Sequence, residues 1–397
     1  MHSEYPIIII GSGLAGYNVA REFRKLNTTA ELILIANDAA DFYSKPMLSN
    51  ALAKNKTAKD LPIANADKMA KDLNAKILKH TRVNKIDPDN HALYTSNNEM
   101  LNYSKLVLAL GASSITLPIS GNAADKIFTV NDLESYAAFR EAIAGKKKIT
   151  IIGAGLIGCE FANDLVLSGY DVSVIGLENN PLDRLLPEQA AEYLKAALAE
   201  QGVNWYLGQE TKEINVVDSV FNIKLESRTE LENNTSSAKG ITLEADVVLS
   251  AIGLRPNIQL AKEAGIEVNK AIVVKQNLET NYKDIYALGD CAEVAGLFLP
   301  YVMPLMNSAR ALAKTLNGEI SNVTYPAMPV LVKTPSCSVV VAAPANNIEG
   351  EWAIKTDGAG VHAQYFDQNG KLQGFALVGK AVEDKQALTK ELPAVLV

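Results

Sequence analysis

Two glycine-rich turns carry the strongest chemical signal in the sequence. Both follow the spacing GxGxxG, with Gly11, Gly13 and Gly16 in the first turn and Gly153, Gly155 and Gly158 in the second. In such a turn the first glycine allows a tight bend, the second lets a pyrophosphate approach the backbone, and the third lets helix and strand pack closely. The N–H groups of the following helix attract the anion. One match is weak evidence, but two matches predict two dinucleotide sites.

The polar residues downstream of each turn differ in how well they suit a ribose. A carboxylate at the end of the second strand of such a unit accepts a hydrogen bond from the ribose 2′-hydroxyl. Asn37 and Asp38 come slightly late for this role, whereas Glu178 stands where it is expected after the second turn. No Arg or Lys lies immediately beside Glu178 to attract a 2′-phosphate, which favours NADH over NADPH. The alternative is that Glu178 is an exposed turn carboxylate without a ligand.

The elements that must position these residues repeat the same order. An apolar strand at 7–10, an amphipathic helix from about residue 15 to 26 and a strand at 31–36 surround the first turn. A strand at 148–152, a helix that stops near Gly169 and a strand at 170–176 surround the second. The turns are 142 residues apart, far beyond the period of roughly 20 to 50 residues of repeat arrays. The chain is therefore predicted to contain two domains of one design.

Composition excludes several other classes of protein. The 397 residues are 48% hydrophobic, and 38 basic against 45 acidic side chains give a net charge of −7. No dense basic block is present, so neither a nucleic-acid partner nor an anionic membrane surface is expected. Apolar runs are much shorter than the ~20 residues that span a bilayer, and the N-terminus has no leader pattern, so we expect a cytoplasmic protein without membrane insertion. Four scattered histidines and three distant cysteines predict no metal site.

Three further segments complete the organisation. Residues 106–114 and 247–257 each pair a buried strand with a glycine turn, as crossovers between domains do. Residues 280–292 place Gly289 and Asp290 after an apolar strand, where the carboxylate would meet a polyol hydroxyl, although a Gly-Asp pair is usually only a turn. From about Pro326, short strand-like runs predict a small α+β domain that caps the first site. The polar stretch 227–239 predicts a solvated hairpin loop.

Taken together, the motifs GSGLAG, GAGLIGCE, AIGLRPN and YALGDCA, in this order, resemble the two-dinucleotide flavoprotein oxidoreductases. In that family FAD occupies the first site and NAD(P)H the second. The resemblance implies an α/β fold with two Rossmann-like three-layer dinucleotide-binding domains and a small C-terminal α+β domain. The implied boundaries are 1–114 and 247–325 for the FAD-binding domain, 115–246 for the NAD-binding domain and 326–397 for the C-terminal domain.

The resemblance also implies roles for individual residues. Those implied to contact FAD are Ser12, Gly13, Leu14, Ala15, Asn37, Asp38, Lys45, Val83 and Asp290, with Val302 and Lys333 near the isoalloxazine. Glu160 would lie where the nicotinamide stacks on the flavin, and Glu160 and Lys45 are the expected catalytic residues. From the residues alone, Lys45 could stabilise an anionic reduced flavin or be a solvated loop lysine. Glu160 could equally be an exposed residue early in a helix.

Narrower motifs suggest the electron acceptor. The stretches YSKPMLS, LPYVMPLM and MPVLVKTPSC resemble those of the bacterial rubredoxin reductases, a branch of the same family. The resemblance implies an enzyme that passes electrons from NADH through FAD to rubredoxin, for a downstream oxygenase or oxygen-defence pathway. A ferredoxin-type carrier, an NADH oxidase and a redox-sensing flavoprotein without turnover remain alternatives. A disulfide reductase is disfavoured, because residues 37–56 contain no cysteine and no CxxC occurs.

Overall fold

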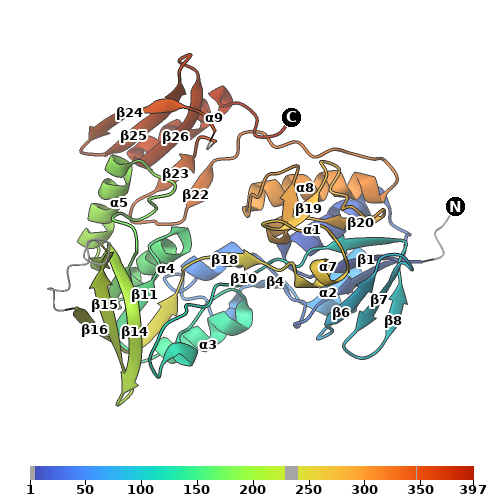
Figure 1. Cartoon of the computed structure of the whole chain (residues 1–397), viewed down its shortest axis with the longest axis horizontal. Helices are drawn as coiled ribbons and strands as arrows, with labels where there is room; N and C mark the ends of the chain where they lie inside the picture. Colours follow the sequence, from blue (N-terminus) through green and yellow to red (C-terminus); the bar gives the residue numbers. More distant parts are fainter. Residues whose placement is uncertain (1–4, 229–239, 346) are drawn as a thin grey trace.

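The computed structural model describes residues 5–228, 240–345 and 347–397. These residues form three lobes: one around β1, one around β11 and one formed by the C-terminal strands (Figure 1). Most of the predicted hairpin loop at 227–239 lies outside the described residues. None of the helices in the described part of the chain combines the length and hydropathy needed to span a bilayer.

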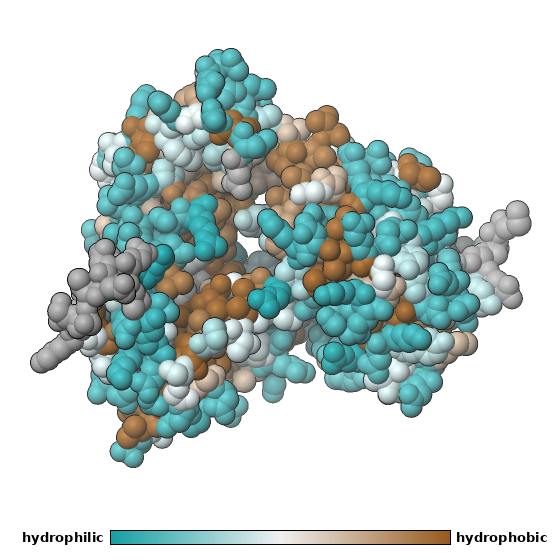
Figure 2. Space-filling view, in the orientation of Figure 1, coloured by the Kyte–Doolittle hydropathy of each residue, from teal (hydrophilic) through white to brown (hydrophobic). Residues whose placement is uncertain are grey.

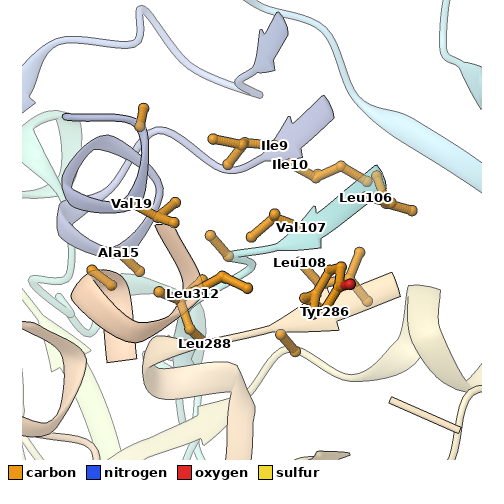
Figure 3. Close-up of a cluster of buried hydrophobic side chains, with 14 of the residues drawn as sticks. Ile9, Ile10, Ala15, Val19, Leu106, Val107, Leu108, Tyr286, Leu288 and Leu312 are labelled. Carbon is orange, nitrogen blue, oxygen red and sulfur yellow. The ribbon is translucent and has the colours of Figure 1, made fainter. Parts of the chain in front are cut away.

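The first glycine turn belongs to a five-stranded parallel sheet in the order β20-β9-β1-β2-β5. The four residues of β1 and of β2 are all buried, as expected for strands covered on both faces. Helix α1 packs against α8, and Figure 3 shows their side chains Val19 and Leu312 meeting those of the sheet, such as Ile9 and Val107. The elements are β1 (Ile7–Ile10), α1 (Leu14–Leu26), β2 (Leu32–Ile35), β5 (Lys76–Leu78), β9 (Lys105–Leu108), β20 (Ile285–Ala287) and α8 (Val302–Leu316).

Smaller elements complete this lobe. They include two short 3-10 helices that matter for the site, η1 (Lys45–Asn50) and η4 (Gly289–Cys291). The others are β3 (Phe42–Tyr43), η2 (Ala58–Asp60), β4 (Pro62–Ala64), α2 (Ala66–Leu73), β6 (Val83–Asp87), β7 (Ala92–Thr95), β8 (Met100–Asn102), α7 (Gln259–Glu263), β19 (Ile272–Val274) and β21 (Ala292–Val294). Because β20 pairs with β9 in parallel, the chain returns to the first sheet after building the second lobe.

The second glycine turn belongs to a four-stranded parallel sheet in the order β13-β12-β11-β17. Helix α4 ends at Leu167, and Gly169 follows with a φ of +87°, so the predicted glycine stop is confirmed. The elements are η3 (Ala124–Lys126), α3 (Leu133–Ile143), β11 (Lys148–Ile152), α4 (Leu156–Leu167), β12 (Asp171–Ile175), α5 (Glu188–Glu200), β13 (Val203–Tyr206), β14 (Gln209–Val217), β15 (Val220–Ser227), β16 (Ile241–Ala245) and β17 (Val247–Ser250).

The C-terminal lobe is a five-stranded antiparallel sheet with a short helix, which is the predicted α+β unit. Its strands are ordered β22-β23-β26-β25-β24. They pack on the second lobe: Val339 and Val378 share a buried cluster with Phe161 and Leu165 of α4. The elements are β22 (Val330–Val332), β23 (Val339–Ala342), β24 (Gly350–Asp357), β25 (Gly360–Asp367), β26 (Leu372–Gly379), η5 (Lys380–Asp384) and α9 (Lys385–Glu391).

Two antiparallel strands, β10 (Ala112–Ser114) and β18 (Leu254–Pro256), connect the first two lobes at the predicted crossovers. Figure 2 shows hydrophobic surface gathered around a hollow where the three lobes face one another. The predicted fold class is confirmed by this architecture, and the boundaries at 114, 246 and 325 stay predictions.

Candidate functional site

The space around the first three glycines separates those that the fold requires from one that it does not. A Cβ at Gly11 would overlap the carbonyl of Ala109, and a Cβ at Gly16 would overlap the carbonyl of Gly11. A Cβ at Gly13, in contrast, would meet no protein atom within 4 Å. Helix α1 begins at Leu14, and no side chain caps its first turn. Open space beside uncapped N–H groups fits the pyrophosphate of a dinucleotide.

The second turn repeats this arrangement. Gly153 has a φ of +114°, and a Cβ there would contact the carbonyl of Ala251. A Cβ at Gly158 would overlap the carbonyl of Gly153, whereas one at Gly155 would meet nothing within 4 Å. No side chain caps α4 at Gly155 either. The chain therefore offers two cradles of the same geometry, one for each dinucleotide.

Asp38 lies beside the first turn although it comes late in sequence. Asn37 and Asp38 follow β2 and are exposed. The Oδ1 atom of Asp38 accepts hydrogen bonds from the Ser12 hydroxyl at 3.4 Å and from the backbone N–H of Ala40 at 2.9 Å. The loop thus places the Asp38 carboxylate beside the glycine turn, where it can accept a hydrogen bond from a ribose hydroxyl.

The environment of Glu178 corrects one expectation from the sequence. An arginine does lie beside this carboxylate in space: Nη2 of Arg184 is 3.3 Å from Oε1 of Glu178. A second guanidinium, that of Arg228, donates to the carbonyl oxygen of Leu177 at 3.3 Å. Arg184 lies on the loop that follows β12 and Arg228 lies just after β15, so neither is an immediate sequence neighbour of Glu178. The Glu178 side chain is 31% exposed, which leaves it accessible to a ribose.

Gly289 and Asp290 pack against the first glycine turn from the far end of the chain. A Cβ at Gly289 would lie 2.8 Å from that of Ala15, so this close approach requires glycine. Asp290 follows in η4 and is partly buried. Burial raises the pKa of the Asp290 carboxyl, and the positive charge of Lys45 opposes that rise. The structure therefore brings Asp290 and Lys45, which are 245 positions apart in sequence, into electrostatic contact.

Lys45 is held rather than solvated. It begins η1, is partly buried, and donates from Nζ to Oδ1 of Asn131 at 3.0 Å. Burial lowers the pKa of its ammonium, and Asp290 provides the largest of the opposing charges. The alternative of a solvated loop lysine is therefore wrong for this residue. A cation fixed in this way is able to stabilise negative charge that develops on a bound ring system.

Glu160 lies at a junction of all three lobes. Its side chain is 0% exposed, so the alternative of an exposed helical residue is wrong. The carboxylate accepts from the Ser49 hydroxyl at 2.5 Å, from the backbone N–H of Lys333 at 2.9 Å, and from the Lys333 ammonium. Nζ of Lys333 also donates to Ser49 at 3.0 Å. Since η1 carries both Lys45 and Ser49, the two expected catalytic residues are connected through one short helix.

The next polar residues of α4 also bind across this junction, although they are not among the residues predicted from the sequence. Asp164 accepts from the backbone N–H groups of Leu52 at 2.9 Å and Ala53 at 3.0 Å, while Asn163 donates to Ser336 at 2.7 Å. A sequence signal was available, because Glu160, Asn163 and Asp164 follow the i, i+3, i+4 spacing of one helix face in an otherwise apolar helix. Such a buried polar face must find partners.

The predicted residues Val83 and Val302 differ in exposure, and two buried polar atoms, on Asn50 and Ser250, were not predicted. Val83 begins β6 and is buried, and Val302 begins α8 with 41% of its surface exposed. Ser250 Oγ and Asn50 Oδ1 are buried without a hydrogen-bond partner among the described residues. Ser250 of β17 pairs with Ile152 of β11. Ile152 directly precedes Gly153, the first glycine of the second turn. Polar atoms left in this state are available to a ligand.

The cysteines offer no thiol chemistry. Cys159, Cys291 and Cys337 are all buried and unpaired. Burial raises the pKa of the Cys159 and Cys291 thiols to about 12 and that of Cys337 to about 11. A thiol that stays protonated and inaccessible is a poor nucleophile. Cys159 packs in the core shared by the second and C-terminal lobes, as a small apolar residue would.

Two parallel sheets, each with a glycine cradle, and a joint between them define a two-dinucleotide oxidoreductase. The family model for pyridine nucleotide-disulphide oxidoreductases matches residues 5–313, and the chain belongs to this family, which uses FAD and NAD(H). A model described as a rubredoxin binding C-terminal domain matches residues 322–392. The residues present at the two cradles fit two dinucleotide cofactors, and the assignment of FAD to the first cradle and NADH to the second stays a prediction.

Relatives that align over nearly the whole chain confirm the narrower resemblance. The rubredoxin-NAD(+) reductase of Alcanivorax borkumensis is 48% identical over 99% of this chain and 100% of its own length. That of Acinetobacter baylyi is 46% identical over 97% of this chain and 96% of its own. The crystal structure of NADH:rubredoxin oxidoreductase from Clostridium acetobutylicum has the same fold, with a TM-score of 0.79 at 24% identity over 97% of this chain and 93% of that one. The roles of individual site residues stay predictions.

Proposed function

We propose that this chain is an NADH-dependent reductase that passes electrons from NADH through FAD to rubredoxin. Family membership and the two cradles support the use of both dinucleotides. The match to a rubredoxin binding domain at 322–392 and the names of the full-length relatives support the choice of acceptor. We further propose a cytoplasmic enzyme, since three unpaired cysteines suit a reducing compartment.

One observation carries the proposal furthest: the C-terminal lobe contributes Lys333 to the buried carboxylate of Glu160. Glu160 stands on α4, the helix that begins at the second cradle, and its third partner Ser49 belongs to the first lobe. The ion pair of Lys333 with Glu160 thus links the lobe that resembles a rubredoxin binding domain to the junction where the two cofactors would meet. The same lobe would hold the carrier close to the flavin.

The side chains divide the work as follows. When bound, FAD accepts a hydride from NADH and releases electrons one at a time, which suits an iron carrier. Lys45 holds a positive charge where the ring system becomes more negative. Glu160, fixed by Ser49 and Lys333, orients the nicotinamide, and the buried surroundings keep water away from it. No general base or nucleophile is required.

The proposal is tested by measuring which electron acceptors are reduced by the wild type and by a variant without cysteines. The wild type and a variant with Cys159, Cys291 and Cys337 all replaced by Ala are assayed with NADH and either oxidised rubredoxin or a small disulfide. Both proteins are expected to reduce rubredoxin at rates within about twofold, because the thiols take no part. Neither protein is expected to reduce the disulfide. Disulfide reduction that disappears with the cysteines, or failure of the wild type to reduce rubredoxin, would contradict the proposal.

A further inference from the structure

The ammonium of Lys45 is held by an uncharged side chain. Its Nζ donates to Oδ1 of Asn131 at 3.0 Å, and within the described part of the chain this amide is its one hydrogen-bond partner. The amide is itself oriented, because Nδ2 of Asn131 donates to the carbonyl of Ala112, the first residue of β10, at 2.8 Å. An ammonium has three donors, so two of them remain for a ligand.

The backbone fixes the position of this amide just before α3. The N–H groups of Asn131 and Asp132 both donate to the Ser135 hydroxyl at 3.1 Å. Asp132 is the N-cap of α3, and its Oδ1 accepts from the backbone N–H of Ser135 at 2.7 Å. Such a capping box sets the angle at which the chain enters the helix. The Asn131 side chain therefore starts from a backbone that has little freedom to move.

Several carboxylates act on Lys45 without pairing with it. Asp290, Asp132 and Asp38 all raise the pKa of its ammonium against the effect of burial, yet none of the described carboxylates forms an ion pair with it. Asp132 is occupied at α3, and Asp38 is bonded within the first lobe. A carboxylate in direct contact would cancel most of the field of the cation, whereas the amide of Asn131 orients the cation and leaves its charge in place.

We propose that Asn131 is a positioning residue for the flavin, which fixes the Lys45 ammonium without neutralising it and so raises the reduction potential of FAD at the first cradle. The inference rests on the proposed function, because it takes the first cradle as the flavin site and Lys45 as a residue beside the ring system. Two-electron reduction makes that ring system more negative. A fixed cation with its charge intact therefore stabilises the reduced form more than the oxidised form.

Two substitutions of Asn131 separate the loss of the anchor from the loss of charge. In Asn131→Leu the ammonium loses its anchor, and we expect the preference of the protein for reduced over oxidised flavin to fall roughly tenfold, which is about 30 mV for a two-electron couple. In Asn131→Asp a carboxylate neutralises the cation, and the expected fall is roughly 100-fold, or about 60 mV, as in Lys45→Met. In the Lys45→Met background, Asn131→Leu is expected to cause no further shift.

The reduction potential is measured on the purified FAD-containing proteins by anaerobic titration of the flavin absorbance against a reference dye. Asn257→Leu is the matched control. Nδ2 of Asn257 donates to the carbonyl of Leu110 at 2.8 Å, close to β10, but its Oδ1 accepts from the hydroxyl of Ser113 at 2.7 Å and not from a cation. The control loses the same kind of bond to the backbone, so we expect its preference for reduced flavin to stay within about twofold of the wild type.

A lower potential in both Asn131 variants that depends on Lys45 supports the inference. It is overturned if Asn131→Leu leaves the potential unchanged, if its shift persists in the Lys45→Met background, or if Asn257→Leu shifts the potential as much. Loss of FAD from both Asn131 variants also overturns it, because a residue that only orients a cation does not retain the cofactor. In each of these cases the proposed function stands as long as NADH bleaches the flavin of the wild type and rubredoxin restores it. If NADH does not bleach the wild type, the proposed function itself fails.

Discussion

Gly13→Ala is expected to fold normally and to lose its FAD. The new Cβ would meet no protein atom within 4 Å, so it causes no steric clash in the folded protein. The expected loss of stability is small, about 0.5 to 1 kcal/mol, because Ala is a poorer N-cap residue than Gly. The methyl group would instead occupy the space where the pyrophosphate approaches the uncapped N–H groups of α1. We expect the affinity for FAD to fall about 100-fold, as for the loss of two or more charge-assisted hydrogen bonds.

Gly16→Ala is the matched control for this prediction. Its Cβ would overlap the carbonyl of Gly11, so the cost, about 3 kcal/mol, falls on the fold itself. Flavin absorbance after gel filtration and far-ultraviolet circular dichroism on heating separate the two effects. Gly155→Ala is expected to keep FAD and to bind NADH poorly, since the same open space exists at the second cradle. A Gly13→Ala protein that retains FAD as the wild type does would show that the first cradle is not the flavin site.

Breaking the junction at Glu160 is expected to weaken the whole molecule. In Lys333→Met, the carboxylate of Glu160 stays fully buried with its charge uncompensated, and in Glu160→Gln the partly buried ammonium of Lys333 loses its partner. We expect each single variant to lose about 3 kcal/mol of unfolding free energy, because removal of one member of a buried ion pair leaves the other unpaired. The double variant is expected to recover much of that loss, since neither charge remains.

Urea unfolding of all four proteins forms a double-mutant cycle for the pair. Lys68→Met serves as the control, because Lys68 and Asp72 form an exposed ion pair on α2, where removal costs less than about 0.5 kcal/mol. The rate at which NADH bleaches the flavin is measured in parallel and is expected to fall roughly tenfold in both single variants, as Glu160 is no longer held in place. Strictly additive losses of stability would contradict the coupling of Glu160 with Lys333.

The sequence allowed much of the fold to be predicted because its signals are local. The first strand, the glycine turn and the amphipathic helix all lie within residues 7–26. Helix α1 begins at Leu14, as that pattern predicts. The stop of α4 before Gly169 is local as well. Propensity and periodicity act over such distances, so they predict elements well.

Much of the site could not be predicted in this way because its contacts are distant in sequence. Lys333 meets Glu160 across 173 positions, and Lys45 meets Asn131 across 86. The arginine beside Glu178 is only six positions away, yet it reaches the carboxylate through a loop whose path no pattern indicates. The family resemblance implied a role for Lys333 and for Glu160 separately, and the structure shows that they form an ion pair.

The central claim is that electrons leave NADH for the flavin and leave the flavin for rubredoxin. It is tested most directly by anaerobic double-mixing stopped-flow spectroscopy of the purified yellow protein. NADH is mixed first and oxidised rubredoxin second, with oxygen or a small disulfide as the second reagent in parallel runs. We expect NADH to bleach the flavin absorbance and rubredoxin to restore it much faster than either alternative acceptor. Restoration by oxygen or by the disulfide alone, with rubredoxin left oxidised, would contradict the account.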